Sequence, residues 1–187
     1  MNPLLGVFGA VGTWPDWRRH FRRGQAGMLG SFAALLVCVP ALWFVWGTLE
    51  ARRAQVQNTV EIQTDFVFFA AMVILWAAAF AVTAAIIALL MRRTEGLTLW
   101  IGARNWAVVF LSLALAAVFA LVRYTPLPFS VAEGALFAAY LGLLPIDIRL
   151  AQRAGGFPLM SAILVGCVVV STSLLVLLSG LQFAINS

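Results

Sequence analysis

The feature that most constrains this chain is its series of long apolar runs, because a helix crosses a bilayer with about 18 or more apolar residues. Such segments are expected at residues 27–49, 66–91, 97–122, 127–146 and 157–185. Charged residues make up 10% of the 187 residues and hydrophobic residues 63%. An ordinary soluble domain has about 25% charged residues. The sequence therefore predicts an all-α integral membrane bundle of five transmembrane helices.

The N-terminal segment, residues 1–26, combines aromatic and basic side chains ahead of a five-helix transmembrane domain at residues 27–187. In a helix that begins near residue 15, Trp14, Trp17 and Phe21 share one face and the arginines lie around the other. Aromatic rings favour the headgroup layer, and cations there attract anionic lipids. We therefore expect a cytoplasmic, interfacial amphipathic helix. The residues expected at the lipid interface are Trp14, Trp17, Arg18, Arg19, Phe21, Arg22 and Arg23.

The arginines are distributed unequally between the two ends of the expected spans. All twelve basic residues are arginines, which fits a GC-rich bacterial genome. Positive charge marks the cytoplasmic side of a membrane protein. We therefore expect a bacterial inner-membrane protein with a cytoplasmic N-terminus and, after five crossings, a periplasmic C-terminus. The nine arginines on the inner side are Arg18, Arg19, Arg22, Arg23, Arg92, Arg93, Arg104, Arg149 and Arg153, and the three on the outer side are Arg52, Arg53 and Arg123.

The composition argues against several classes of function. The formal charge of +5 sits beside apolar runs, where it sets topology and meets lipid, so nucleic acid is not an expected partner. His20 is the only histidine, while Cys38 and Cys167 fall inside apolar runs without metal-ligand spacing. We expect no metal or other cofactor. We also expect no enzymatic activity, because no base is paired with a nucleophile.

Arg104 is one of two charged residues that fall within the expected spans, where charge is costly. The apolar run at residues 106–122 holds 17 residues, which is just enough to span. Arg104 can therefore extend to the cytoplasmic headgroups between two tryptophans. The alternative pairs Arg104 with Asp147, which the topology places at the same depth at the end of the fourth span. That pair would tie two helices together or form an inner gate.

Glu133 is the second charged residue within the expected spans. Residues 134–146 supply only 13 residues, so a fourth span that ends there must draw Glu133 into the outer part of the bilayer. Arg123, at the outer end of the third span, is the nearest plausible cation. We expect a structural pair or a neutral, hydrogen-bonded Glu133. The alternative is a role in carrying a proton or a substrate.

Gly134, Ala138 and Gly142 recur every four residues along the fourth span. Small residues at this spacing place a smooth stripe along one side of a helix, and another helix can approach it closely. We therefore expect this stripe to be a helix-packing face.

The order of parts resembles the Yip family of five-helix membrane proteins, which have a cytoplasmic N-terminal segment, five spans and an outside C-terminus. More narrowly, residues 17–32, 104–106 and 149–156 look like the corresponding segments of uncharacterised relatives in alphaproteobacteria. The resemblance implies the fold and carries no functional residue across. Eukaryotic members are tied to vesicle traffic and small GTPases, and they carry a longer polar N-terminal region than this chain has.

Together these features favour a non-enzymatic inner-membrane protein, an accessory or scaffold subunit of a larger membrane complex. Its expected partners are anionic lipids at the basic N-terminus and other membrane protein subunits. The alternative is a small transporter or proton-conducting protein that uses Glu133, with Arg104 and Asp147 at an inner constriction. Flux that depends on Glu133 would distinguish the two functions.

Overall fold

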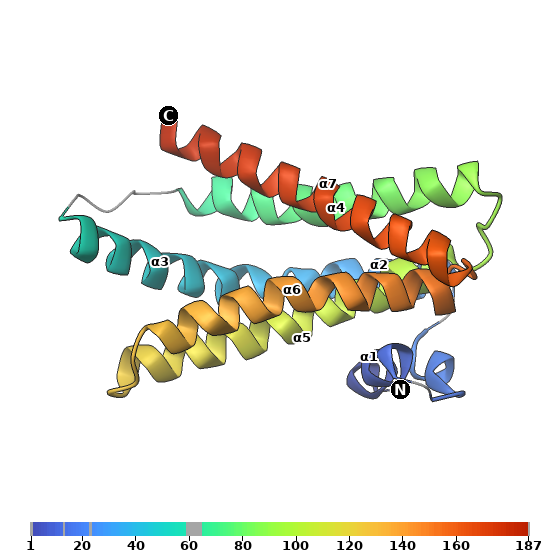
Figure 1. Cartoon of the computed structure of the whole chain (residues 1–187), viewed down its shortest axis with the longest axis horizontal. Helices are drawn as coiled ribbons and strands as arrows, with labels where there is room; N and C mark the ends of the chain where they lie inside the picture. Colours follow the sequence, from blue (N-terminus) through green and yellow to red (C-terminus); the bar gives the residue numbers. More distant parts are fainter. Residues whose placement is uncertain (1, 13, 23, 59–64, 187) are drawn as a thin grey trace.

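The computed structural model describes residues 2–12, 14–22, 24–58 and 65–186. These residues form helices and short connectors, without a strand among them (Figure 1). The all-α architecture expected from the apolar runs is therefore confirmed. In chain order the elements are α1 (Pro3–Val11), the 3-10 helix η1 (Trp17–His20), α2 (Gly24–Leu35), α3 (Cys38–Gln57), α4 (Phe66–Leu90), α5 (Leu97–Tyr124), α6 (Ser130–Arg153) and α7 (Leu159–Asn186).

Within the described residues, five helical segments are long and apolar enough to cross a membrane. The first, Gly24–Gln57, combines α2 and α3, and the others lie in α4, α5, α6 and α7. The chain is thus a multi-pass membrane protein. The helices of the second, third and fifth spans begin and end within two residues of the expected limits. The first span is longer at both ends, whereas the helix of the fourth begins three residues later than expected and ends seven residues later.

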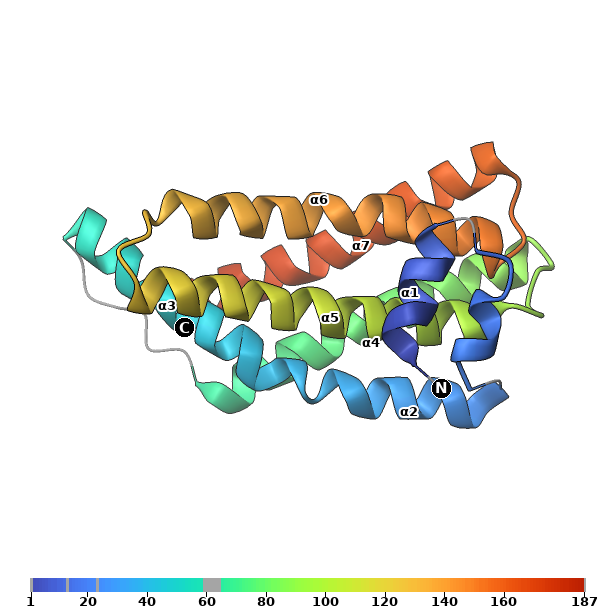
Figure 2. The same cartoon turned by 90° about the horizontal axis from the view of Figure 1, so that it is seen from below.

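Helix α5 is the central element of the bundle, and it packs against α2, α3, α4 and α6. Figure 2 shows α5 running between α6 on one side and α2 with α3 on the other. Helices α4 and α7 pack together and lie on one side of the group formed by α2, α3, α5 and α6 (Figure 1). The α4–α5 and α6–α7 connections lie beside α1 and η1 at one end, which we call the N-terminal end. The α5–α6 connection lies at the opposite end.

The first span is interrupted between α2 and α3, just before Pro40. Pro40 has no N–H group, so it cannot donate to the carbonyl of Leu36 as an ordinary helical residue would. Instead the Leu36 carbonyl accepts from the amide of Val39 at 3.3 Å, and the amide of Val37 donates to Ala34 at 3.0 Å. These tighter turns carry the chain through the break and let α3 continue to Gln57.

The fourth span was expected to end at residue 146, but α6 extends beyond that residue. The helix continues through Pro145 to Arg153. Its last turns pack against α7, where Gly166 lies directly beside Ile148. A proline interrupts only one hydrogen bond of a helix, and packing on a neighbouring helix can hold the rest in place.

The N-terminal segment differs from the expected single helix that begins near residue 15. Asn2 caps α1, whose first residue is Pro3, and a separate short helix η1 follows the turn. Trp17 and Phe21 are 2% and 6% exposed and pack in the core, so their rings contact other parts of the chain instead of lipid. The other residues expected at the interface are Trp14, Arg18, Arg19 and Arg22, which are exposed, and Arg23, which lies outside the described residues.

Arg153 accounts for this docking of the N-terminal segment. Its guanidinium donates to the carbonyls of Gly9 at 2.6 Å and Trp14 at 2.7 Å, and also to Gly12. Its guanidinium also lies 5.7 Å from the ring of Trp17. The last carbonyls of a helix carry partial negative charge, so a cation at this position stabilises the end of α1. Sequence reasoning treated Arg153 only as a topology signal.

Candidate functional site

Arg104 and Asp147 form an ion pair inside the bundle, between α5 and α6. Nε of Arg104 lies 3.6 Å from Oδ1 of Asp147, and the two side chains are 1% and 0% exposed. The pairing expected from the topology is therefore present. The other expectation, that Arg104 extends to the headgroups, is wrong, because the whole side chain is enclosed by other helices. Arg104 lies seven residues into α5, about 10 Å along the helix from Leu97.

Helix α4 supplies the aromatic surroundings of this pair. The guanidinium carbon of Arg104 lies 4.7 Å from the ring centroid of Trp76 and 4.6 Å from that of Phe80. Each ring presents its negative face to the cation, a contact worth about 0.5–2 kcal/mol. Nε of Arg104 and both oxygens of Asp147 make no hydrogen bond within the described structure, so the pair is held by charge and packing.

A second polar contact lies one residue further along α5. The amide nitrogen of Asn105 donates to Oγ of Ser31 at 3.0 Å, and Ser31 donates to the carbonyl of Met28 at 2.6 Å. Both Asn105 and Ser31 are 0% exposed. This contact joins α2 to α5, so adjacent residues of α5 bind two different helices. Sequence reasoning missed it, although Asn105 is a polar residue beside Arg104 in an apolar run.

Glu133 and Arg123 are not brought together. Arg123 donates to Oγ1 of Thr48 at 3.4 Å and lies 5.7 Å from the ring of Phe44. Glu133 is exposed near the start of α6 and forms no ion pair with any residue that the structure describes. Helix α6 runs from Ser130 to Arg153, so the fourth span does not have to end at residue 146. The length of the helix alone therefore no longer requires Glu133 to lie inside the bilayer, and its depth stays a prediction.

Glu133, Tyr140 and Asp147 occupy one side of α6 at intervals of seven residues. Seven residues turn a helix to within about 20° of its starting direction and advance it about 10 Å. The Tyr140 hydroxyl, which lies between the two carboxylates along the helix, is buried without a hydrogen-bond partner among the described residues. The buried hydroxyl of Ser173 on α7 also has no hydrogen-bond partner among the described residues.

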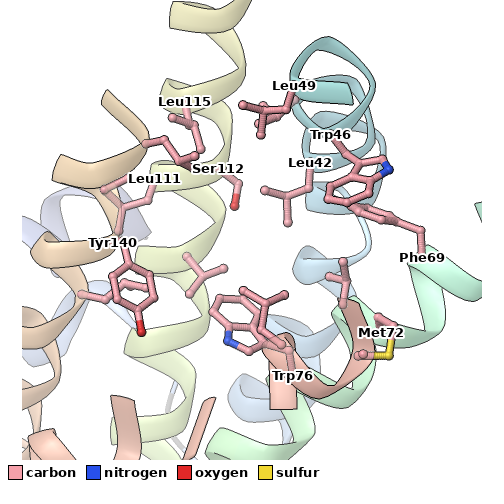
Figure 3. A pocket seen from close by; sticks show the side chains of 18 of the residues that line it. Leu42, Trp46, Leu49, Phe69, Met72, Trp76, Leu111, Ser112, Leu115 and Tyr140 are labelled. Carbon is pink, nitrogen blue, oxygen red and sulfur yellow. The ribbon is translucent and has the colours of Figure 1, made fainter. Parts of the chain in front are cut away.

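A pocket of about 330 Å³ lies beside this side of α6, between α3, α4, α5 and α7 (Figure 3). Its lining is almost entirely apolar, with the Ser112 hydroxyl and the Tyr140 ring among the few polar side chains. The rings of Trp46, Phe69 and Trp76 border it. The pocket is about twice the size of an apolar cavity that stays dry and admits benzene. Glu133, Arg104 and Asp147 do not line it.

The stripe formed by Gly134, Ala138 and Gly142 faces away from the bundle. A Cβ atom added at Gly134 or Gly142 would meet nothing within 4 Å, and Ala138 is exposed. The expected packing partner is therefore not a described helix of this chain. Glycines used inside the bundle behave differently, because a Cβ atom at Gly166 would lie 2.6 Å from the side chain of Ile148.

Comparisons with protein-family models, with curated proteins and with solved structures found no match to this chain. The resemblance to the Yip family therefore rests on the sequence pattern alone. No group of three or more His, Cys, Asp or Glu side chains able to hold a metal ion occurs among the described residues. The fold and the site together define a multi-pass α-helical membrane protein with an ion pair enclosed in its bundle.

Proposed function

We propose that this chain is a non-enzymatic accessory or scaffold subunit of a larger complex in a bacterial inner membrane, with its N-terminus in the cytoplasm. The observation that carries the proposal is the outward-facing stripe of Gly134, Ala138 and Gly142. Between helices in lipid, association depends on close van der Waals packing, which small residues permit. The arginine distribution supports the orientation.

The use of glycine inside this bundle supports the same reasoning. Gly166 admits Ile148 of α6, and Gly180 admits the side chain of Met72 of α4. In both places a small residue lets a neighbouring helix come close. Gly134 and Gly142 offer the same opening on a face that the described chain leaves uncovered, so a helix of another protein fits there.

Site-specific photocrosslinking in native membranes tests this proposal. A photoreactive residue at position 138 should give one discrete crosslinked species of constant mass, and Gly134→Leu with Gly142→Leu should abolish it. Gly47, on α3, is also open to its surroundings. Gly47→Leu is therefore the matched control, which adds the same bulk to another outward face and should leave the crosslink intact.

Three outcomes would contradict this proposal. A crosslinked species with the mass of two copies of this chain would replace it with self-association. Absence of any protein crosslink at position 138, with the chain recovered from native lipid as a stable monomer, would remove it. Equal loss in the Gly47→Leu control would show that the stripe has no special part.

A second candidate, proton conduction, is favoured by the alignment of Glu133, Tyr140 and Asp147 on one side of α6. These groups would exchange protons in steps of about 10 Å, a distance that requires intervening water or movement of side chains. Asp147 beside Arg104 would form the inner constriction, and Glu133 the outer entry. The exposed position of Glu133 suits exchange with the outer aqueous phase.

Proton flux into vesicles containing the purified protein tests this second candidate. Tyr140→Phe removes one hydroxyl without changing the ring, and Glu133→Gln removes one carboxylate, so each should lower flux at least tenfold. Tyr124→Phe, at the exposed end of α5, is the matched control and should conduct like the unmodified protein. Flux that persists unchanged in both Glu133→Gln and Tyr140→Phe would eliminate this function.

A further inference from the structure

A second pocket, of about 260 Å³, lies at the N-terminal end of the bundle, where the N-terminal segment meets α2 and α5. It is distinct from the apolar pocket beside α6 and from the buried ion pair. Its polar lining comes from His20, Arg22 and Thr98, and its apolar lining includes Gly30, Gly102 and Trp106.

The three polar lining residues all lie toward the end of the bundle, and the residues further along α2 and α5 are apolar. Thr98, Gly102 and Trp106 follow one another at intervals of four along α5, so each lies about 6 Å further into the membrane than the last. Arg22 and Gly30 show the same order, because Arg22 precedes α2 and Gly30 lies within it. Both helices begin at this end of the bundle. The pocket is therefore basic at its mouth and apolar further in.

The mouth of the pocket favours an anion. Arg22 is exposed and His20 half-buried, and no described residue that lines the pocket is acidic. Arg18, exposed on the adjoining η1, adds positive charge, whereas Arg19 is paired with Asp16 at 3.4 Å. Helix α5 begins after Gly96 without a side-chain cap, and its Leu97 amide donates to the carbonyl of Thr94. The positive end of the helix dipole adds some partial positive charge near Thr98.

The inner part of the pocket favours a hydrocarbon chain. A Cβ atom at Gly30 would meet nothing within 4 Å, and one at Gly102 would meet only Oγ of Ser31 at 3.9 Å. These two glycines leave space between α2 and α5, in the part of the pocket that Trp106 also lines. In a membrane this part of the pocket would face lipid. An acyl chain could contact the pocket there without a clash at either glycine.

We propose that this pocket binds one anionic phospholipid from the leaflet at the N-terminal end of the bundle. Its phosphate lies among His20, Arg22 and the Thr98 hydroxyl, and one acyl chain lies along Gly30, Gly102 and Trp106. The ligand must be both anionic and apolar, because each property is matched by a different part of the pocket.

Native mass spectrometry of the full chain, titrated with phosphatidylglycerol or phosphatidylcholine, tests the proposal. The unmodified protein should retain one phosphatidylglycerol in preference to phosphatidylcholine. Arg22→Gln with Thr98→Val removes two headgroup contacts and should weaken binding about tenfold or more. Gly30→Leu fills the channel and should weaken it similarly. The matched controls, Arg149→Gln and Gly47→Leu, change an exposed arginine and an open glycine outside the pocket and should bind normally.

Several results would overturn the proposal. Equal weakening by Arg22→Gln with Thr98→Val and by Arg149→Gln would mean diffuse attraction by many arginines. Unchanged binding in Gly30→Leu would remove the acyl chain from the channel. Competition by soluble glycerol phosphate at the concentration of the lipid would show that the apolar part contributes nothing. Circular dichroism establishes that each variant is folded, and equal retention of the two lipids by the unmodified protein refutes the proposal without any variant.

Discussion

Replacing Asp147 with Asn leaves the buried guanidinium of Arg104 without its counter-charge and should strongly destabilise the bundle. At the observed separation of 3.6 Å, the attraction between the charges amounts to roughly 4–5 kcal/mol at an effective dielectric constant of about 20. Removal of one member of a buried pair typically costs about 3–5 kcal/mol. We therefore expect Asp147→Asn to lower the free energy of unfolding by about 3–5 kcal/mol.

The unfolded state in a micelle adds to this effect. When the helices separate, Arg104 is no longer enclosed, and its long side chain can reach the polar interface from about two turns inside α5. In the variant, the unpaired charge of Arg104 is therefore more stable in the unfolded state, where it reaches the interface, than in the folded bundle. Titration with sodium dodecyl sulfate in mixed micelles, followed by circular dichroism, measures the free energy of unfolding of each variant.

A double variant isolates the pair from its packing. Arg104→Met with Asp147→Leu removes both charges and keeps apolar bulk, so its stability should fall within about 2 kcal/mol of the unmodified protein, the loss including the contacts with Trp76 and Phe80. Glu133→Gln makes the same acid-to-amide change at an exposed position of α6 and should alter stability by less than about 0.5 kcal/mol. A loss below about 1 kcal/mol in Asp147→Asn, or a double variant less stable than Asp147→Asn, would refute the reasoning.

Three further predictions concern contacts that fix the helices. Ser31→Ala removes the partner of the Asn105 amide and should cost about 1–2 kcal/mol in the same titration, whereas no loss would mean the contact is dispensable. Arg153→Gln should speed hydrogen exchange in residues 3–21 by on the order of tenfold, measured by mass spectrometry, because the carbonyls of α1 lose their cation. Gly166→Leu should cost about 1–3 kcal/mol or more by overpacking against Ile148, and a thermal midpoint equal to that of Gly142→Leu would contradict this.

Much of the fold is predictable because the span of a bilayer imposes a length on each apolar run. The predicted helix boundaries that were wrong are those that depend on contacts between distant segments of the chain. Helix α6 runs past Pro145 because α7 packs against its last turns, and a sequence pattern does not show that contact. The N-terminal segment shows the same limitation, since Trp17 is buried by docking that depends on Arg153, far along the chain.

The ion pair was predictable in part for a different reason. Topology gives the depth of each residue, so Arg104 and Asp147 could be placed at one level from their distance to the ends of their spans. Rotation about the helix axis is harder to obtain. Helix α4 is apolar on all sides, so its sequence does not reveal that Trp76 and Phe80 face the guanidinium. The pairing follows from depth, whereas its aromatic enclosure follows from packing.

The two proposed functions depend on opposite sides of α6, and this separates them experimentally. Residues that are seven apart, such as Tyr140 and Asp147, face the interior, whereas Gly134 and Gly142 lie roughly 120–160° around the helix from them. Bulk added at the glycine stripe therefore leaves the polar side in place, and Tyr140→Phe leaves the stripe in place. If Tyr140→Phe abolished the crosslink at position 138, the two sides would be coupled through movement of the whole helix. In that event the rigid bundle assumed in both proposals would be wrong.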